Sequence, residues 1–156
     1  RSRRTVLIPD QLYRYRMHRA SMMHSASDAS SDLADKIDKH RSAVTAILND
    51  WQAQGWQDIR PSDLLGWILD LLALDVSRLP PARQGPILLP LFRRMDDYFV
   101  GGVDAVADLV TRPLVRSVRR AAAEGGPAFS RGELALFYLR RRGLANCLRR
   151  LARPRF

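Results

Sequence analysis

The chain has 156 residues, of which 46% are hydrophobic, so it can bury a sizeable core and is not disordered throughout. Its single cysteine excludes an internal disulfide framework and a cysteine-rich zinc module. A net charge of +10 favours a polyanionic partner.

The positive charge is concentrated at the two ends of the chain. Residues 1–24 carry six Arg and one Asp, residues 25–111 carry eight basic and thirteen acidic side chains, and residues 112–156 carry twelve Arg and two Glu. Even complete pairing of both ends with the acidic middle leaves about ten positive charges, and such a surface repels itself unless an anion binds it. The preference for Arg over Lys suits forked phosphate contacts, although a GC-rich coding sequence produces the same bias.

No run of residues reaches the ~18–20 apolar side chains that a membrane span needs, since Asp63, Asp70 and Asp75 interrupt the most apolar stretch. The N-terminal stretch lacks the apolar h-region of a secretory signal. A chain that begins with Arg1 indicates a processed product or part of a longer protein. We therefore expect no membrane partner, and a location inside the cell or inside a virion or organelle assembly rather than secretion.

The first 31 residues are predicted to be a basic arm and a linker of small polar residues. Between Leu12 and Arg19 aromatic and apolar side chains alternate with basic ones, which gives an extended segment one aromatic and one basic face. The tyrosines would then stack on bases and the arginines would contact phosphates. Two other interpretations stay open: an arm that lies along a neighbouring surface, and a helix in which the alternation is accidental.

Residues 32–54 form the clearest amphipathic helix. Ser31 or Asp32 suits its N-cap, and Gly55 suits its C-terminal end. His40 lies on the apolar stripe, where a lone histidine is expected to be a packed core-edge residue rather than a ligand. The stripe consists of Leu33, Ile37, Val44, Ile47, Leu48 and Trp51.

Residues 62–76 are apolar around most of a helical circumference, and we expect this helix to be the buried centre of the fold. Ser62 is its expected N-cap. The line left for water or for close backbone contact passes through Asp63, Gly66, Asp70 and Ala73.

The next segment is predicted to be a loop over residues 82–85 and a short helix over residues 86–99, because Pro80 and Pro81 stop the preceding helix. The charged residues of this short helix are interpreted as a solvated ion-pair cluster. They are Arg93, Arg94, Asp96 and Asp97.

Beyond a Gly101-Gly102 turn, apolar residues from Val103 to Ala121 follow one stripe that contains Pro113. Either one helix bends at Pro113, or Thr111 caps a second helix with Pro113 in its first turn. The opposite face carries four arginines at positions i, i+4, i+7 and i+8, which point one way. They are Arg112, Arg116, Arg119 and Arg120.

A Gly125-Gly126-Pro127 break precedes the last predicted helix, which begins with a capping box formed by Ser130 and Glu133. This helix runs through residues 134–151, and Gly143 is a point that divides it. Arginines are frequent along it and beyond its end. They are Arg140, Arg141, Arg142, Arg149, Arg150, Arg153 and Arg155.

No motif in the chain indicates catalysis or metal binding. His18, His24 and His40 lack metal-ligand spacing, and there is no cysteine cluster, P-loop or nucleophile elbow. Cys147 lies among arginines and is interpreted as a small core residue. We expect a protein that is not an enzyme and needs neither a cofactor nor a metal.

The sequence thus predicts an all-α fold, a compact bundle of about five helices around residues 62–76, with residues 32–156 as the helical domain. Its predicted function is that of a structural subunit that contacts nucleic-acid phosphates, with RNA or single strands favoured because no helix-turn-helix, zinc-finger or basic-zipper pattern is present. The alternative is a protein-interaction or oligomerisation subunit whose arginines dock on an acidic partner; attachment to anionic membrane is a weaker interpretation. The predicted contact residues are Tyr13, Arg14, Tyr15, Arg16, Arg112, Arg116, Arg119, Arg120, Arg140, Arg141, Arg142, Arg149 and Arg150.

Overall fold

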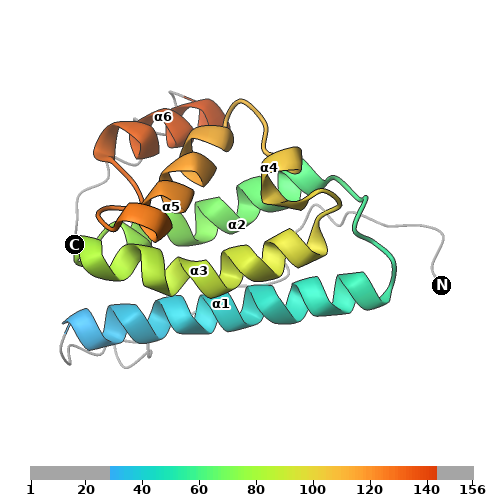
Figure 1. Cartoon of the computed structure of the whole chain (residues 1–156), viewed down its shortest axis with the longest axis horizontal. Coiled ribbons are helices and arrows are strands. Elements are labelled where there is room, and N and C mark those ends of the chain that lie inside the picture. Colours follow the sequence, from blue (N-terminus) through green and yellow to red (C-terminus); the bar gives the residue numbers. More distant parts are fainter. Residues whose placement is uncertain (1–28, 144–156) are drawn as a thin grey trace, which may run out of the picture.

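The computed structural model describes residues 29–143, with side chains from Leu33 onward (Figure 1). This part is all-helical, which confirms the predicted fold class; it has six helices where about five were expected, and no strand. The predicted N-terminal arm and the end of the last predicted helix lie outside the described residues. The helices are α1 (Ala29–Ala53), α2 (Pro61–Val76), α3 (Pro81–Tyr98), α4 (Gly102–Val106), α5 (Arg112–Glu124) and α6 (Arg131–Arg142).

Helices α2 and α3 both pack against α1, and each also contacts two further helices. Helix α2 contacts α1, α4 and α6, while α3 contacts α1, α4 and α5, and α5 and α6 contact each other. Figure 1 shows α1 and α3 running alongside each other below the α5–α6 pair. The packing does not single out α2 as the one central helix, because α3 has a comparable set of neighbours.

Helix α2 is buried around most of its circumference, and one ridge of it is exposed. Gly66 and Ala73, expected at its surface or at a close backbone contact, are buried, whereas Trp67 and Leu74 are 40% and 45% exposed. The expectation that this helix is buried apart from the line through Asp63, Gly66, Asp70 and Ala73 is wrong for the ridge that exposes Trp67 and Leu74. Gly66 is buried because α6 comes close there: a Cβ atom would lie 2.9 Å from the guanidinium carbon of Arg141.

Helix α1 begins at Ala29, so the expected N-cap at Ser31 or Asp32 is wrong. Its end agrees with expectation. Gly55 has φ +72°, its N–H donates to Gln52 O at 3.0 Å, and the Trp56 N–H donates to Trp51 O at 2.9 Å. These two bonds form a Schellman motif, and the accompanying apolar contact is the edge-to-face pair of Trp51 and Trp56.

The first residues of α2 and of α3 both differ from the prediction. Ser62 does not cap α2; its hydroxyl donates to Val106 O at 2.8 Å and ties α2 to α4. Helix α3 begins at Pro81, so residues 82–85 are helical rather than a loop. Pro81 lacks the N–H that would be unpaired in a first turn, and this favours it there rather than as a terminator.

Buried Gln84 explains why the first turn of α3 is held in place. Its amide N–H donates to Leu79 O at 2.8 Å, and its amide oxygen accepts from the Ala128 N–H at 2.9 Å. A buried amide needs such partners, because an unpaired one costs the full desolvation penalty. Gln84 thereby joins the α2–α3 turn to the segment before α6, a role that the loop interpretation of residues 82–85 missed.

The single stripe expected from Val103 to Ala121 is divided between two helices, of which α5 has Thr111 at its N-cap and Pro113 in its first turn, as the second alternative required. The Thr111 hydroxyl does not cap the helix. It donates to Asp108 Oδ1 at 2.8 Å, and the same carboxylate oxygen accepts the N–H groups of Val110 and Thr111. Asp108 therefore organises the turn between α4 and α5.

The capping box of α6 is confirmed. The Glu133 N–H donates to Ser130 Oγ at 3.1 Å, and the Ser130 N–H donates to Glu133 Oε2 at 2.9 Å. Gly143, with φ +76°, is the C-cap at the end of α6.

Helices α3 and α5 approach closely at Gly85, which gives a test of the packing. A Cβ atom on Gly85 would lie 2.9 Å from Ala121 O, a backbone atom that cannot turn away. We predict that Gly85→Ala lowers the free energy of unfolding in urea by about 1–3 kcal/mol, the usual cost of overpacking. Gly132→Ala is the matched control, because no atom lies within 4 Å of a Cβ there. Equal stability of the two variants would contradict the close approach.

Candidate nucleic-acid interface

The predicted contact residues fall into two groups. Tyr13, Arg14, Tyr15, Arg16, Arg149 and Arg150 lie outside the described residues, so their roles stay predictions. The other seven arginines belong to α5 and α6, and the structure gives them different partners.

Three arginines follow one ridge of α5, and all three are exposed. Arg112 Nη2 donates to Ala107 O at 2.9 Å, and Arg120 Nη2 donates to Ser117 Oγ at 3.3 Å. Arg116 has no hydrogen bond or ion pair with any described residue. The hydrogen-bond partners of this ridge are neutral oxygens, but Arg120 also interacts electrostatically with the Glu133 carboxylate, which accepts a hydrogen bond from the same Ser117 hydroxyl. Arg112 and Arg116 have no ion pair with a carboxylate of the described part.

Arg119 was expected on this ridge as a phosphate contact, but it is half-buried and engaged within the protein. Its Nη2 donates to Asp96 Oδ1 at 2.6 Å and to Asp104 Oδ2 at 3.2 Å, and its guanidinium lies over the Phe92 ring. One arginine thereby joins α3, α4 and α5.

The pKa of Asp96 reflects this arrangement. Burial acts to raise it, but hydrogen bonds from Arg119 and from the Val103 N–H, together with the positive charge of Arg119, hold the pKa below its ordinary value of 3.8. The hydrogen bond to Asp96 raises the pKa of Arg119 against the effect of its own burial.

The three arginines at the end of α6 also differ in their contacts. Arg142 Nη2 donates to Asp70 Oδ1 at 2.5 Å and its guanidinium lies over the Tyr138 ring, so this residue joins α6 to α2. Arg141 lies against Gly66 of α2. Arg140 is exposed, and its Nη1 donates to Leu109 O at 3.3 Å. Arg142, like Arg119, is thus a packing residue rather than the predicted surface contact.

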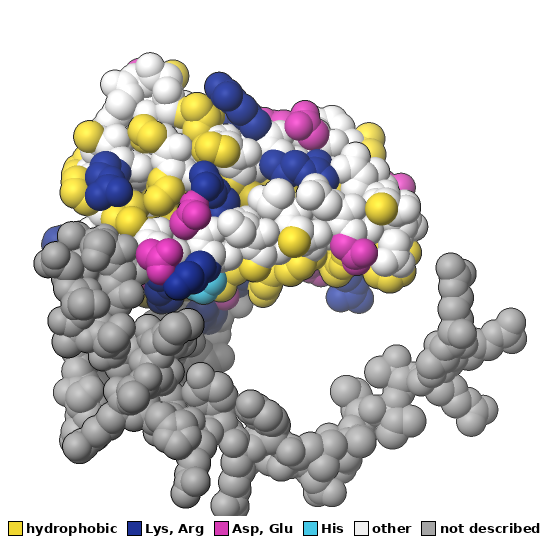
Figure 2. All heavy atoms as spheres, turned by 90° about the horizontal axis from the view of Figure 1, so that it is seen from below, with side chains coloured by type: hydrophobic (Ala, Val, Ile, Leu, Met, Phe, Trp, Pro, Cys, Tyr) yellow, Lys and Arg dark blue, Asp and Glu magenta, His cyan; other side chains and the backbone are white. Residues whose placement is uncertain are grey.

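The described part of the chain is almost neutral. Residues 29–143 hold sixteen basic and fourteen acidic side chains, a net charge of +2. The face in Figure 2, seen from below the view of Figure 1, carries basic, acidic and hydrophobic side chains intermixed rather than one basic field. Most of the net charge of the chain therefore belongs to the two ends, and within the described part it is concentrated on α5 and α6.

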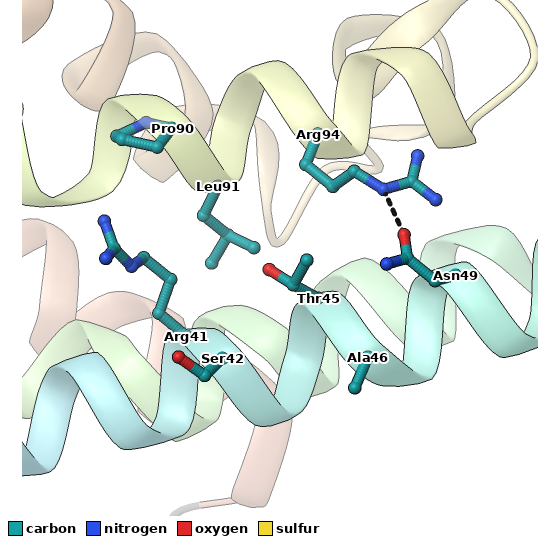
Figure 3. Close-up of a pocket in the computed structure, with 8 residues that line it drawn as sticks. All are labelled: Arg41, Ser42, Thr45, Ala46, Asn49, Pro90, Leu91 and Arg94. Atoms are coloured by element: carbon teal, nitrogen blue, oxygen red, sulfur yellow. Dashed lines mark hydrogen bonds between the residues drawn. The ribbon is translucent and has the colours of Figure 1, made fainter.

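A second place suited to an anion lies between α1 and α3 (Figure 3). It is a shallow groove of about 490 Å³. At one end, Arg94 Nε donates to Asn49 Oδ1 at 2.8 Å and Arg94 Nη2 donates to Gln52 Oε1 at 2.6 Å, so two neutral amides orient the guanidinium without cancelling its charge. The lining residues are Arg41, Ser42, Thr45, Ala46, Asn49, Pro90, Leu91 and Arg94.

This groove corrects the interpretation of the α3 charges as one ion-pair cluster. Arg94 reaches across to α1, and Asp96 points to α5, so these two residues serve different helix contacts. The sequence feature that could have indicated this contact of Arg94 is the pair Asn49 and Gln52, two polar residues one turn apart beside the apolar stripe of α1.

The described part of the chain holds neither a metal-binding group of side chains nor a membrane-spanning helix. No group of three or more His, Cys, Asp or Glu in this part is placed to hold a metal ion, and none of its helices is both long and apolar enough to cross a membrane. His40 is half-buried, as expected at the edge of the core, and its Nδ1 is enclosed without a hydrogen-bond partner in the described part.

Comparison with protein-family models, curated proteins and solved structures finds no match to the chain.

The Asp96–Arg119 contact predicts a specific pH dependence. Because the pKa of folded Asp96 lies below its unfolded value, its contribution is complete above the unfolded pKa and disappears as the pH falls through the folded pKa. At pH 7, Asp96→Asn should lower the free energy of unfolding by about 1–2 kcal/mol, since it weakens bonds to a charged group and to a backbone N–H.

The measurement is urea unfolding of wild type and Asp96→Asn from pH 7 down to pH 2.5. The difference between the two proteins should shrink below about pH 4, where the unfolded carboxyl becomes protonated. Asp97→Asn is the control, because Asp97 is exposed and has no ion pair or hydrogen bond with a described residue. A difference that is independent of pH would show that the charge of Asp96 is not what stabilises the contact.

Proposed function

We propose that the protein is a non-enzymatic structural subunit that associates with nucleic acid inside a larger assembly. The contacts are to backbone phosphates, and RNA or single strands are favoured over duplex DNA. The observation that carries the proposal is the exposed ridge of α5, on which Arg112 donates only to a neutral carbonyl oxygen and Arg116 has no hydrogen bond or ion pair with a described residue. Exposed guanidiniums that lack internal carboxylates are the groups that phosphates neutralise.

Two further features support phosphate contacts. Arg140 is exposed on α6, the helix that packs against α5, so it extends the basic surface. Arg94 is a cation held by Asn49 at one end of the α1–α3 groove, whose lining also includes the hydroxyl residues Ser42 and Thr45 (Figure 3). Since the described part has a net charge of only +2, the arm residues Tyr13, Arg14, Tyr15 and Arg16 and the C-terminal Arg149 and Arg150 remain part of the proposed contact set.

An acidic protein partner is the second candidate, and the exposed leucines near Arg140 favour it. Leu109 is 78% exposed and offers its carbonyl oxygen to Arg140, while Leu136 on the same helix as Arg140 is 41% exposed. Apolar side chains beside Arg are typical of protein interfaces.

Salt-dependent binding to labelled single-stranded RNA tests the proposal. For single strands, log K should fall with log salt at about −0.7 per phosphate contact. We predict that Arg116→Ala and Arg120→Ala each weaken binding and reduce the slope by about one contact, and that Arg94→Ala does so for the groove. Joint substitution of Arg14 and Arg16 by Ala tests the arm in the same way.

Lys39→Ala is the control matched in charge, since it removes one positive side chain from the exposed surface of α1. It should leave the slope unchanged. Equal effects of Lys39→Ala and Arg116→Ala would show that binding depends on net charge alone and not on the ridge of α5. Absence of binding by the wild-type chain at low salt would reject the proposal and favour the acidic protein partner.

A further inference from the structure

One ridge of α2 exposes two large apolar side chains. Trp67 and Leu74 are seven residues apart, so they lie on the same side of the helix two turns from each other. Helices α1 and α6 pack on α2 but leave these two side chains 40% and 45% exposed. Large apolar side chains gathered on one helix side, rather than scattered singly, indicate an interaction surface.

The two ends of this ridge carry opposite charges. Asp63 lies one turn before Trp67, and Arg78 lies four residues after Leu74, in the turn just beyond the end of α2. Their side chains are 70% and 60% exposed. Among residues 29–143, each has only a long ion pair, Asp63 with Arg60 at 3.6 Å and Arg78 with Asp75 at 3.4 Å. We call the set Asp63, Trp67, Leu74 and Arg78 the α2 ridge.

A groove of about 660 Å³ opens beside Leu74, between the end of α2 and α6. Its walls are mainly apolar, and Arg78 and Arg131 belong to its lining. This is the kind of concave surface that receives an aromatic side chain from a partner. The apolar lining residues are Leu74, Phe129, Leu134, Ala135 and Tyr138.

We propose that the α2 ridge is the interface of a homodimer, in which α2 packs antiparallel against α2 of a second copy. A two-fold axis between residues 70 and 71 places Trp67 beside Leu74 of the partner subunit, at the mouth of the groove. The same axis places Asp63 beside Arg78 of the partner subunit. Each contact occurs twice, as an isologous interface requires.

Charge selects the antiparallel arrangement. A parallel pair would set Asp63 against Asp63 of the partner subunit and Arg78 against Arg78 of the partner subunit, and like charges in contact are repulsive. In the antiparallel pair both ends are complementary. Asp70, close to the axis, already holds Arg142 as its counter-ion, so its approach to the partner adds no uncompensated negative charge.

The first test is the molecular mass of the full-length protein by sedimentation across a concentration series, without nucleic acid. Wild type should form a dimer, and Trp67→Ala should raise the dissociation constant about 30-fold, as expected for a central aromatic anchor. Leu109→Ala is the control, because Leu109 is still more exposed but lies outside the α2 ridge. A wild-type monomer at every concentration, or a dimer unaffected by Trp67→Ala, would overturn the proposal.

The second test separates contact from folding. Asp63→Arg and Arg78→Glu should each weaken the homodimer, because each sets like charges opposite one another. An equimolar mixture should recover association, since both charge pairs of the mixed dimer are then opposite in sign. A folding defect is not corrected by mixing, so failure of the mixture to associate above the level of either variant would overturn the antiparallel arrangement.

Discussion

A guanidinium that is partly buried needs carboxylates or other oxygen acceptors as hydrogen-bond partners. In the described fold, Arg119 and Arg142 find these partners on other helices, and their contacts join the helices to one another. Arg119 has Asp96 and Asp104 as partners, and so joins α3, α4 and α5. Arg142 has Asp70 as its partner and joins α6 to α2. Both contacts link residues far apart in the chain, and without their carboxylates the desolvated cations would be costly to bury.

The same requirement limits how far the sequence predicts the site. Helical periodicity correctly places Arg112, Arg116, Arg119 and Arg120 on one side of α5, because this depends only on local geometry. It does not show that Arg119, at the edge of this side, faces α3 and α4, where Asp96 and Asp104 lie. Charge counting treats all four alike, whereas tertiary packing leaves Arg119 half-buried and paired with Asp96 and Asp104.

The fold itself was predictable where local chemistry decides it. The capping box at Ser130 and Glu133 and the glycine turn at Gly55 are formed by neighbouring residues, and both occur as expected. The start of α3 was missed because a tertiary contact decides it: Gln84 is held by Leu79 and by Ala128, 44 residues away. The same holds for Ser62, whose hydroxyl serves α4 rather than its own helix.

The two proposed surfaces belong to different helices, and this has a consequence for affinity. The α2 ridge follows α2 and the turn after it, while the exposed arginines lie mainly on α5, whose main contacts are with α3, α4 and α6. Dimerisation through α2 would therefore leave the α5 arginines of both copies accessible. Because the described part carries a net charge of only +2, one copy offers a single strand few fixed phosphate contacts. Two copies held together would bind a longer strand at two places, and the second contact would form at high effective concentration provided that the strand can span both.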